Sequence, residues 1–216
     1  MSKKIVLNGL DVYLLAQKGL YIPQYHLLVI SDWHLGKLQH FRQEGIFVPA
    51  PDPEEEFQKL KLLIEELKIK EIVFLGDLFH SKWNKHWDLF KSFIHNFRYQ
   101  IQFILTVGNH DILEERHFKD TALELKQHHI LSEGIVFSHE PIIGLEDHLY
   151  NIVGHIHPGC LVEAGARQTL RLPCFHLEGK LLTMPAFGKY TGLHILQVNG
   201  KNQLFAIVGD SVIELK

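Results

Sequence analysis

The chain has 216 residues, of which 46% are hydrophobic, 22% charged and 11% aromatic. This composition is that of a globular protein and excludes a disordered, collagen-like or coiled-coil chain. The formal net charge is −3, whereas proteins that coat DNA non-specifically are strongly basic. A local cleft for one stretch of nucleic acid is compatible with this charge.

The cysteine count and the apolar runs restrict the location of the protein. Cys160 and Cys174 are the only two cysteines, too few for the disulfide framework of a secreted domain. No apolar run approaches the roughly 18 residues of a membrane span. We therefore expect a soluble, cytoplasmic protein without membrane contact. Because no linker or repeat interrupts the sequence, we expect one domain over residues 1–216.

The first half of the chain alternates between strand and helix patterns. Short strands are predicted over 4–9, 11–16, 19–23 and 26–31. A helix follows, with Asp52 as N-cap and Pro53 as its first residue, and with apolar residues at helical spacing up to Leu67. A strand over 71–76, a helix over 85–98 and a strand over 101–108 come next. This alternation predicts a parallel sheet covered by helices.

The second half reads mainly as β-structure. Short apolar strands are predicted over 134–140, 150–155, 176–187, 192–198, 203–209 and 211–216. Together the two halves predict an α/β fold in which two mixed β-sheets pack together and are flanked by helices.

Five of the predicted strands each run into polar residues that could hold a metal ion. These residues are Asp32 and His34, Asp77, Asn109 with His110 and Asp111, His139, and His155 with His157. In open α/β sheets, sites form where the carboxyl ends of strands converge. Residues two apart in extended chain point to the same side. Asp32 with His34, and His155 with His157, are therefore each expected to face a common centre.

The donor types indicate which metals could bind. Carboxylate, amide and imidazole donors without thiolate suit Mn, Fe or Zn. There are more candidate ligands than one ion needs, whereas two ions that share a bridging carboxylate would use them all. Such a pair suits in-line attack on phosphorus.

The ordered series Asp32-x-His34, Gly76-Asp77, Gly108-Asn109-His110-Asp111, His139 and Gly154-His155-x-His157 resembles the calcineurin-like metallophosphoesterase family. The resemblance implies an αββα sandwich and a metal-dependent phosphoesterase, a hydrolase acting on ester bonds. It implies a first metal held by Asp32, His34, Asp77 and His157, and a second held by Asn109, His139 and His155, with Asp77 bridging. His110 would be the acid that protonates the leaving group, and Asp111 would orient it.

A narrower resemblance covers nearly the whole chain. The segments SDWHLGK, FRQEG, GDLFH, GHIHP and LPCFHLEGKLLTMPAFGKYTG are similar to the bacterial DNA-ligase-associated metallophosphoesterases. That subfamily implies a DNA endonuclease of the DNA damage response, with DNA as substrate and a functional association with an ATP-dependent DNA ligase and a helicase. Mn is the first metal to expect, with Fe, Zn or Mg as alternatives.

Two other functions fit the same motifs. A phosphatase or phosphodiesterase for small nucleotides would use the same metals and ligands. A non-catalytic scaffold on this fold is the third reading, and the intact His110 argues against it. The oligomeric state is left open.

Several charged and aromatic residues near the motifs could contact a substrate. Lys37 and Arg42 follow the first motif within loop reach and could steady a phosphate. Arg167 and Arg171 could line a surface along which nucleic acid binds, although two arginines alone are weak evidence for one. Lys82, Trp83, Lys85, His86 and Trp87 form a basic, aromatic cluster in which packing is favoured over base stacking. His80 could equally be structural or support the site.

Overall fold

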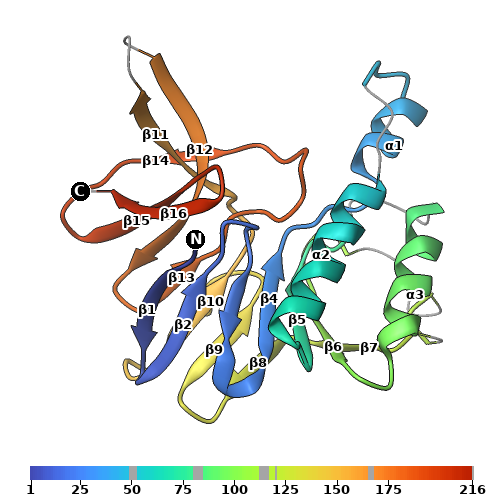
Figure 1. Cartoon of the computed structure of the whole chain (residues 1–216), viewed down its shortest axis with the longest axis horizontal. Helices are drawn as coiled ribbons and strands as arrows, with labels where there is room; N and C mark the ends of the chain where they lie inside the picture. The colour runs from blue at the N-terminus through green and yellow to red at the C-terminus, as the bar shows by residue number, and fades with distance from the viewer. Residues whose placement is uncertain (49–52, 80–84, 112–116, 120, 165–167, 216) are drawn as a thin grey trace.

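The computed structural model describes residues 1–48, 53–79, 85–111, 117–119, 121–164 and 168–215. Within these residues the chain forms two β-sheets and three α-helices (Figure 1). Asp52, His80, Lys82, Trp83 and Arg167 lie outside the described residues, so their predicted roles are not addressed by the structure.

The first sheet contains seven strands in chain order among the described residues. They are β1 (Lys3–Leu7), β2 (Leu10–Leu14), β3 (Leu20–Ile22), β4 (Leu27–Ser31), β5 (Glu71–Leu75), β6 (Gln102–Thr106) and β7 (Leu123–Lys126). Strands β1 to β4 pair antiparallel, and β4 to β7 pair parallel. The sheet is therefore mixed, with its parallel half where the alternation predicted it.

The second sheet is also mixed and contains nine strands of the described chain. They are β8 (His128–Leu131), β9 (Ile135–Ser138), β10 (Tyr150–Val153), β11 (Pro158–Ala164), β12 (Gln168–Glu178), β13 (Leu181–Thr183), β14 (His194–Leu196), β15 (Asn202–Val208) and β16 (Ser211–Leu215). Strand β10 lies parallel to both β9 and β13. The β11–β12 hairpin extends well beyond the rest of the sheet (Figure 1).

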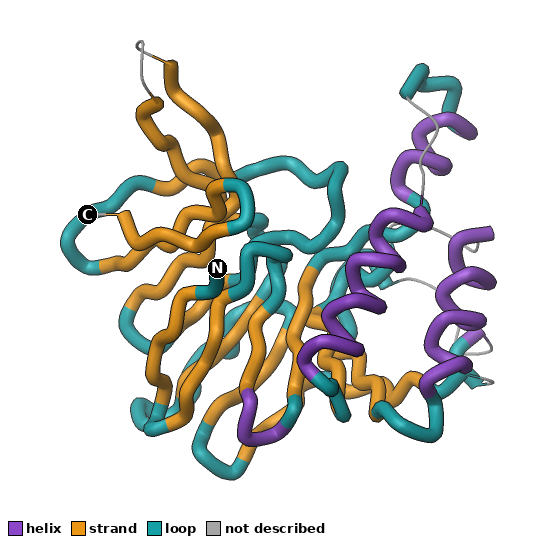
Figure 2. Tube along the Cα trace, viewed as in Figure 1, coloured by secondary structure: helices purple, strands orange, loops and turns teal. Residues whose placement is uncertain are grey.

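The α-helices gather on one side of the strands (Figure 2). They are α1 (Lys37–Gln43), α2 (Pro53–Leu67) and α3 (Lys85–Phe97), and a short 3-10 turn, η1 (Pro23–Tyr25), precedes β4. Helix α2 connects β4 to β5, and α3 connects β5 to β6, which is the crossover arrangement that parallel strands require.

Alternate residues of β4 face two different cores, as strand geometry requires. Leu28 and Ile30 pack with the apolar faces of α2 and α3. Leu27 and Val29 pack with residues of the second sheet, including Phe137. The layers are therefore helices, first sheet and second sheet, and the central strands β4, β5 and β6 of the first sheet are buried on both faces. Two packed mixed sheets with helices confirm the predicted fold class.

Several boundaries differ from the sequence-based expectation. The strand expected over 176–187 is two pieces, because β12 ends at Glu178 and β13 begins at Leu181 after a turn at Gly179 and Lys180. Helix α1 and strands β7, β8 and β11 were not predicted. No helix in the described ranges has both the length and the apolar composition needed to cross a lipid bilayer.

A substitution at Phe90 on α3 tests how much the core between the helices and the first sheet stabilises the fold. The Phe90 ring is fully buried and lies 5.6 to 6.1 Å, centroid to centroid, from those of Trp33, Phe74, Phe79 and Trp87. We expect Phe90→Ala to lower the free energy of unfolding by about 3–5 kcal/mol, because it leaves a cavity. Urea unfolding followed by circular dichroism measures the change. The matched control is Leu89→Ala, one residue away and 47% exposed, which should stay within about 0.5 kcal/mol. Equal losses in both variants would contradict this packing.

Candidate metal centre

The strand ends of both sheets meet and bring the predicted ligands together. Asp32, Asp77 and Asn109 follow β4, β5 and β6 of the first sheet, while His139, His155 and His157 follow β9 and β10 of the second. Two groups of side chains then lie close enough to share an ion. One group is Asp32, His34 and His157, and the other is Asp77, His139 and His155. The site therefore needs both sheets.

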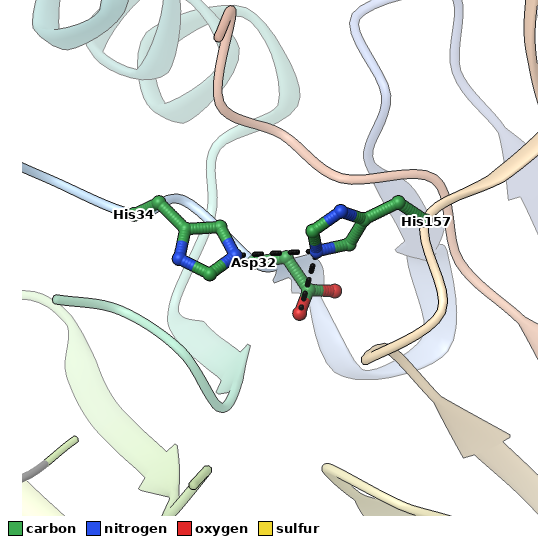
Figure 3. A group of neighbouring side chains, drawn as sticks. All are labelled: Asp32, His34 and His157. Carbon is green, nitrogen blue, oxygen red and sulfur yellow. Dashed lines mark hydrogen bonds and ion pairs between the residues drawn. The ribbon is translucent and has the colours of Figure 1, made fainter. Parts of the chain in front are cut away.

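The first group, shown in Figure 3, has two buried members and one half-buried member, His157. The Nε2 atoms of His34 and His157 lie 3.2 Å apart, and His157 Nε2 lies 3.4 Å from Asp32 Oδ1. Asp32 is fully buried and His34 is buried. The Asp32 carboxylate also accepts hydrogen bonds from the Ser31 hydroxyl at 2.5 Å and from the His155 backbone N–H at 3.0 Å. These bonds fix the orientation of the carboxylate.

The second group converges on His139 Nε2. This atom lies 3.1 Å from His155 Nδ1, 3.0 Å from Asn109 Oδ1 and 3.5 Å from Asp77 Oδ1. His139 is buried and His155 is exposed. The group is therefore open to solvent on the His155 side.

Asp77 connects the two groups. Its Oδ2 lies 3.9 Å from His34 Nε2, and its Oδ1 lies 3.5 Å from His139 Nε2. Oδ1 also accepts the backbone N–H of His110 at 2.8 Å. One carboxylate thus presents a different oxygen to each group, which is the geometry of a bridging ligand.

The hydrogen bonds around His139 show whether the residues of the second group could bind a cation. His139 Nδ1 lies 3.1 Å from the Leu75 carbonyl oxygen, so Nδ1 carries the proton and donates it there. In the neutral ring, Nε2 then presents a lone pair toward the oxygens of Asn109 and Asp77, which are acceptors as well. A divalent ion would relieve the repulsion between these acceptors. The donor set, with imidazole, carboxylate and amide groups and no thiolate, fits Mn, Fe or Zn.

The backbone of the site is strained. Asp32, His34, Asp77, His155 and His157 all have φ between 46° and 72°. Non-glycine residues rarely adopt this left-handed region, and they do so where the surrounding structure enforces it. The expectation that residues two apart converge because the chain is extended is therefore wrong. Asp32 and His34 do meet, but in a left-handed turn beyond β4, and His155 and His157 belong to different groups.

Two glycines allow the sheets to approach. A Cβ on Gly76 would lie 2.3 Å from His139 Nδ1, and a Cβ on Gly154 would lie 2.4 Å from Asp32 Oδ2. Each glycine comes directly before a site residue, Asp77 or His155, and makes room for a side chain from the other sheet. The glycines of the GD and GHxH motifs are thus explained by close approach.

His110 and Asp111 lie beside the two groups in different ways. The His110 ring is half-buried, with its centroid 5.5 Å from that of His34. The Asp111 carboxylate accepts the backbone N–H groups of Gly108 and Phe79 at 2.9 and 3.1 Å. Desolvation raises the pKa of Asp111 to about 6, although these two N–H donors favour the charged form. Through these bonds Asp111 holds the backbone of the loop that carries Asn109 and His110.

The structure separates the two residues suggested as phosphate contacts. Lys37 is half-buried at the start of α1, next to the turn that carries His34. Arg42 lies toward the other end of α1, where its guanidinium donates to the Val48 carbonyl oxygen at 3.2 Å. Within the basic, aromatic cluster predicted over residues 82–87, His86 and Trp87 are buried, as packing residues would be. Arg171 is exposed on β12.

Ser31 and Glu56 support the site but were not predicted from the sequence. The two Glu56 oxygens accept the Trp33 indole N–H at 3.0 Å and the Lys189 backbone N–H at 2.7 Å. Trp33 stands between Asp32 and His34, so this carboxylate links α2 and the segment after β13 to the ligand turn. Glu56 belongs to a run of three glutamates at the start of α2, which resembles ordinary helix-start charge. No local signal distinguishes it.

Comparisons with known proteins bear on this site. Residues 25–182 match the family model described as calcineurin-like phosphoesterase. No curated protein matches the sequence. Among solved structures, the nuclease MPE of Pseudomonas putida is 23% identical over 100% of both chains, with a TM-score of 0.79. The phosphoesterase Yfce of E. coli is 13% identical over 88% of this chain and 97% of its own, with a TM-score of 0.47. An archaeal phosphodiesterase is 15% identical over 88% of this chain and 98% of its own, with a TM-score of 0.42.

The likeness to the Pseudomonas putida protein shows a shared fold over the full length. The family match starts just before β4 and ends in β13, so it spans every strand end described above. Members of this family are hydrolases of phosphate esters that depend on two metal ions. Because the match covers well over half of the sequence and both groups of candidate ligands, the chain belongs to the calcineurin-like phosphoesterase family.

Proposed function

We propose that the protein is a dinuclear metal-dependent phosphodiesterase that cuts DNA. The observation that carries this proposal is the position of Asp77, whose two oxygens face two separate groups of imidazole and carboxylate donors. A single metal would leave half of these donors without an ion, whereas a pair of metals engages all of them.

The proposed ligands follow the two groups. Asp32, His34 and His157 would hold the first ion, and Asn109, His139 and His155 the second, with Asp77 shared between them. Two divalent ions bound there would lower the pKa of a water and neutralise the charge that develops on the phosphoryl oxygens. Mn is the metal we propose first, and Fe, Zn or Mg are the alternatives.

His110 is proposed as the general acid. It follows Asn109 but directs its ring toward His34, while the Asn109 amide faces His139. The Asp77 carboxylate accepts the backbone N–H of His110, which fixes the His110 backbone next to both groups. From that position it can donate a proton to the oxygen that leaves phosphorus. A positioned acid of this kind contributes about 10²–10⁴ in rate.

DNA as the substrate is supported by two likenesses. The whole chain shares its fold with a protein described as a nuclease, and its C-terminal motif resembles that of DNA-ligase-associated metallophosphoesterases. On that basis we propose a repair endonuclease that acts together with an ATP-dependent DNA ligase and a helicase. A cytoplasmic location and a single domain are part of the same proposal.

One reconstitution experiment tests the substrate class. Metal-stripped protein is supplied with Mn, Mg, Zn or Fe and offered nicked, single-stranded and duplex DNA beside a chromogenic diester. Cleavage of DNA with at least one metal is the expected result. Hydrolysis confined to small nucleotides or monoesters, with DNA left intact under every metal, would favour the small-nucleotide phosphatase instead.

Asp77→Asn tests the bridging ligand. An amide has one oxygen in place of two and carries no charge, so both ions should bind more weakly. His34→Ala should mainly remove one ion, because His34 belongs to only one group. Metal content per chain, measured by elemental analysis after dialysis, gives the result. His128→Ala, at an exposed histidine of β8, is the control and should retain both ions. Unchanged metal content in Asp77→Asn would remove the bridge from this proposal.

His110→Ala tests the general acid. The variant should retain its metal, because His110 is not a proposed ligand, and should lose about 10²–10⁴ in turnover of DNA. The loss should be smaller for a nitrophenyl diester, since nitrophenolate departs without a proton. Metal content and both rates are measured on one preparation. Metal lost along with activity would make His110 a ligand, and equal losses on both substrates would leave it as a stabiliser of the transition state.

A further inference from the structure

A small pocket adjoins the first group of ligands. It lies between the turn that joins β4 to α1, the first turn of α3 and the segment after β13. The residues that matter for its chemistry are Trp33, His34, Lys37, Glu56, His86 and Tyr190. Because His34 forms part of the wall, a group in this pocket would touch the turn that carries the proposed metal ligands.

Lys37 supplies a positive charge to this pocket. Its side chain is half-buried, and within the described residues no hydrogen-bond acceptor pairs with its ammonium group. Desolvation lowers the pKa of Lys37, while attraction to the Asp77 carboxylate opposes that change. A cation that has lost part of its hydration without gaining a partner is unfavourable by itself. An anionic ligand would supply the missing partner.

The other charges around the pocket already have partners. Both oxygens of Glu56 accept N–H groups, from Trp33 and from Lys189. Desolvation lowers the pKa of both Lys18 and Lys59, and attraction to the Glu56 carboxylate opposes that change in each, so the negative charge of Glu56 is compensated on that side. The Lys189 ammonium pairs with Glu55 at 2.7 Å. Lys37 is therefore the lining cation that remains available for a ligand in this part of the described chain.

The size of the pocket restricts what can enter. Its free volume is about 30 Å³, and one water occupies roughly 10–15 Å³ measured in this way. A space of this size suits a small polar group such as the oxygens of a phosphate. Two aromatic residues line this space, Trp33, which is buried, and Tyr190, which is 44% exposed.

We propose that this pocket receives the phosphate next to the scissile one in a DNA strand, with Lys37 as its cation. This inference rests on the proposed function and adds to it a reason for selecting polynucleotides. A mononucleotide or a simple diester has no second phosphate to place there. The pocket therefore favours a strand that continues beyond the cleaved bond.

The test compares two forms of the enzyme on two substrates. Wild type and Lys37→Gln, both loaded with Mn, are assayed on a dinucleoside monophosphate, which has one phosphodiester, and on an oligothymidine with several. Wild type should have a kcat/KM per bond about 10- to 100-fold higher on the oligothymidine, the range of one charge-assisted hydrogen bond. Lys37→Gln should lose that preference, so that its kcat/KM per bond on the oligothymidine falls to within about twofold of its own value on the dinucleoside monophosphate.

Two further variants separate charge from folding. Lys37→Arg keeps the charge and should restore most of the preference. Lys61→Gln, an exposed lysine of α2 paired with Glu65, removes the same charge elsewhere and should leave the preference unchanged. The slope of log affinity for the single strand against log salt should become shallower by about 0.7 in Lys37→Gln but not in Lys61→Gln.

Each other outcome would count against the inference in a different way. Equal losses on both substrates would place Lys37 at the scissile phosphate or in support of the ligand turn. An unchanged preference in Lys37→Gln would mean that the pocket takes no phosphate. If wild type cut neither substrate with any metal, the proposed function itself would fail, and this inference with it.

Discussion

The site depends on the contact between Asp77 and the two sheets. Its carboxylate faces His34 through one oxygen and His139 through the other, and it also holds the main chain of His110. Asp77 is thus a buried anion of the first sheet that lies close to an imidazole from each sheet, and Asp32 makes a second buried contact between the sheets through His157. The glycine before Asp77 makes room for His139, and the glycine before His155 makes room for Asp32, so both allow the two sheets to meet around this carboxylate.

Much of this arrangement could be predicted from sequence because it depends on strong local signals. Apolar runs such as 71–75 mark buried parallel strands, and the polar residues that follow them mark the carboxyl edge where sites form. The alternation of strand and helix patterns predicts the parallel half of the first sheet. These signals are enough to place Asp32, Asp77 and Asn109 at one edge, and the structure has them there.

The missed elements have weak local signals. Strands β7 and β8 lie at the edges of their sheets, where one neighbour is missing and few side chains are buried. Strand β11 begins with Pro158 and Gly159, residues that normally argue against a strand. His155 and His157 do not face one centre as predicted, because both residues have positive φ and the chain is not extended there. Contacts such as Glu56 with Trp33 link residues far apart in sequence, and no local pattern reveals them.

That the ligand-capable residues come from both sheets has a consequence for folding. Neither sheet alone can present both His34 and His157, or both Asp77 and His139, so a chain whose two halves have not docked cannot form the site. Any ion that binds only the docked state stabilises it by mass action, by an amount that grows with the logarithm of ion concentration over the dissociation constant. If divalent ions bind there as proposed, the free energy of unfolding would depend on their concentration, and removing them would lower both stability and activity.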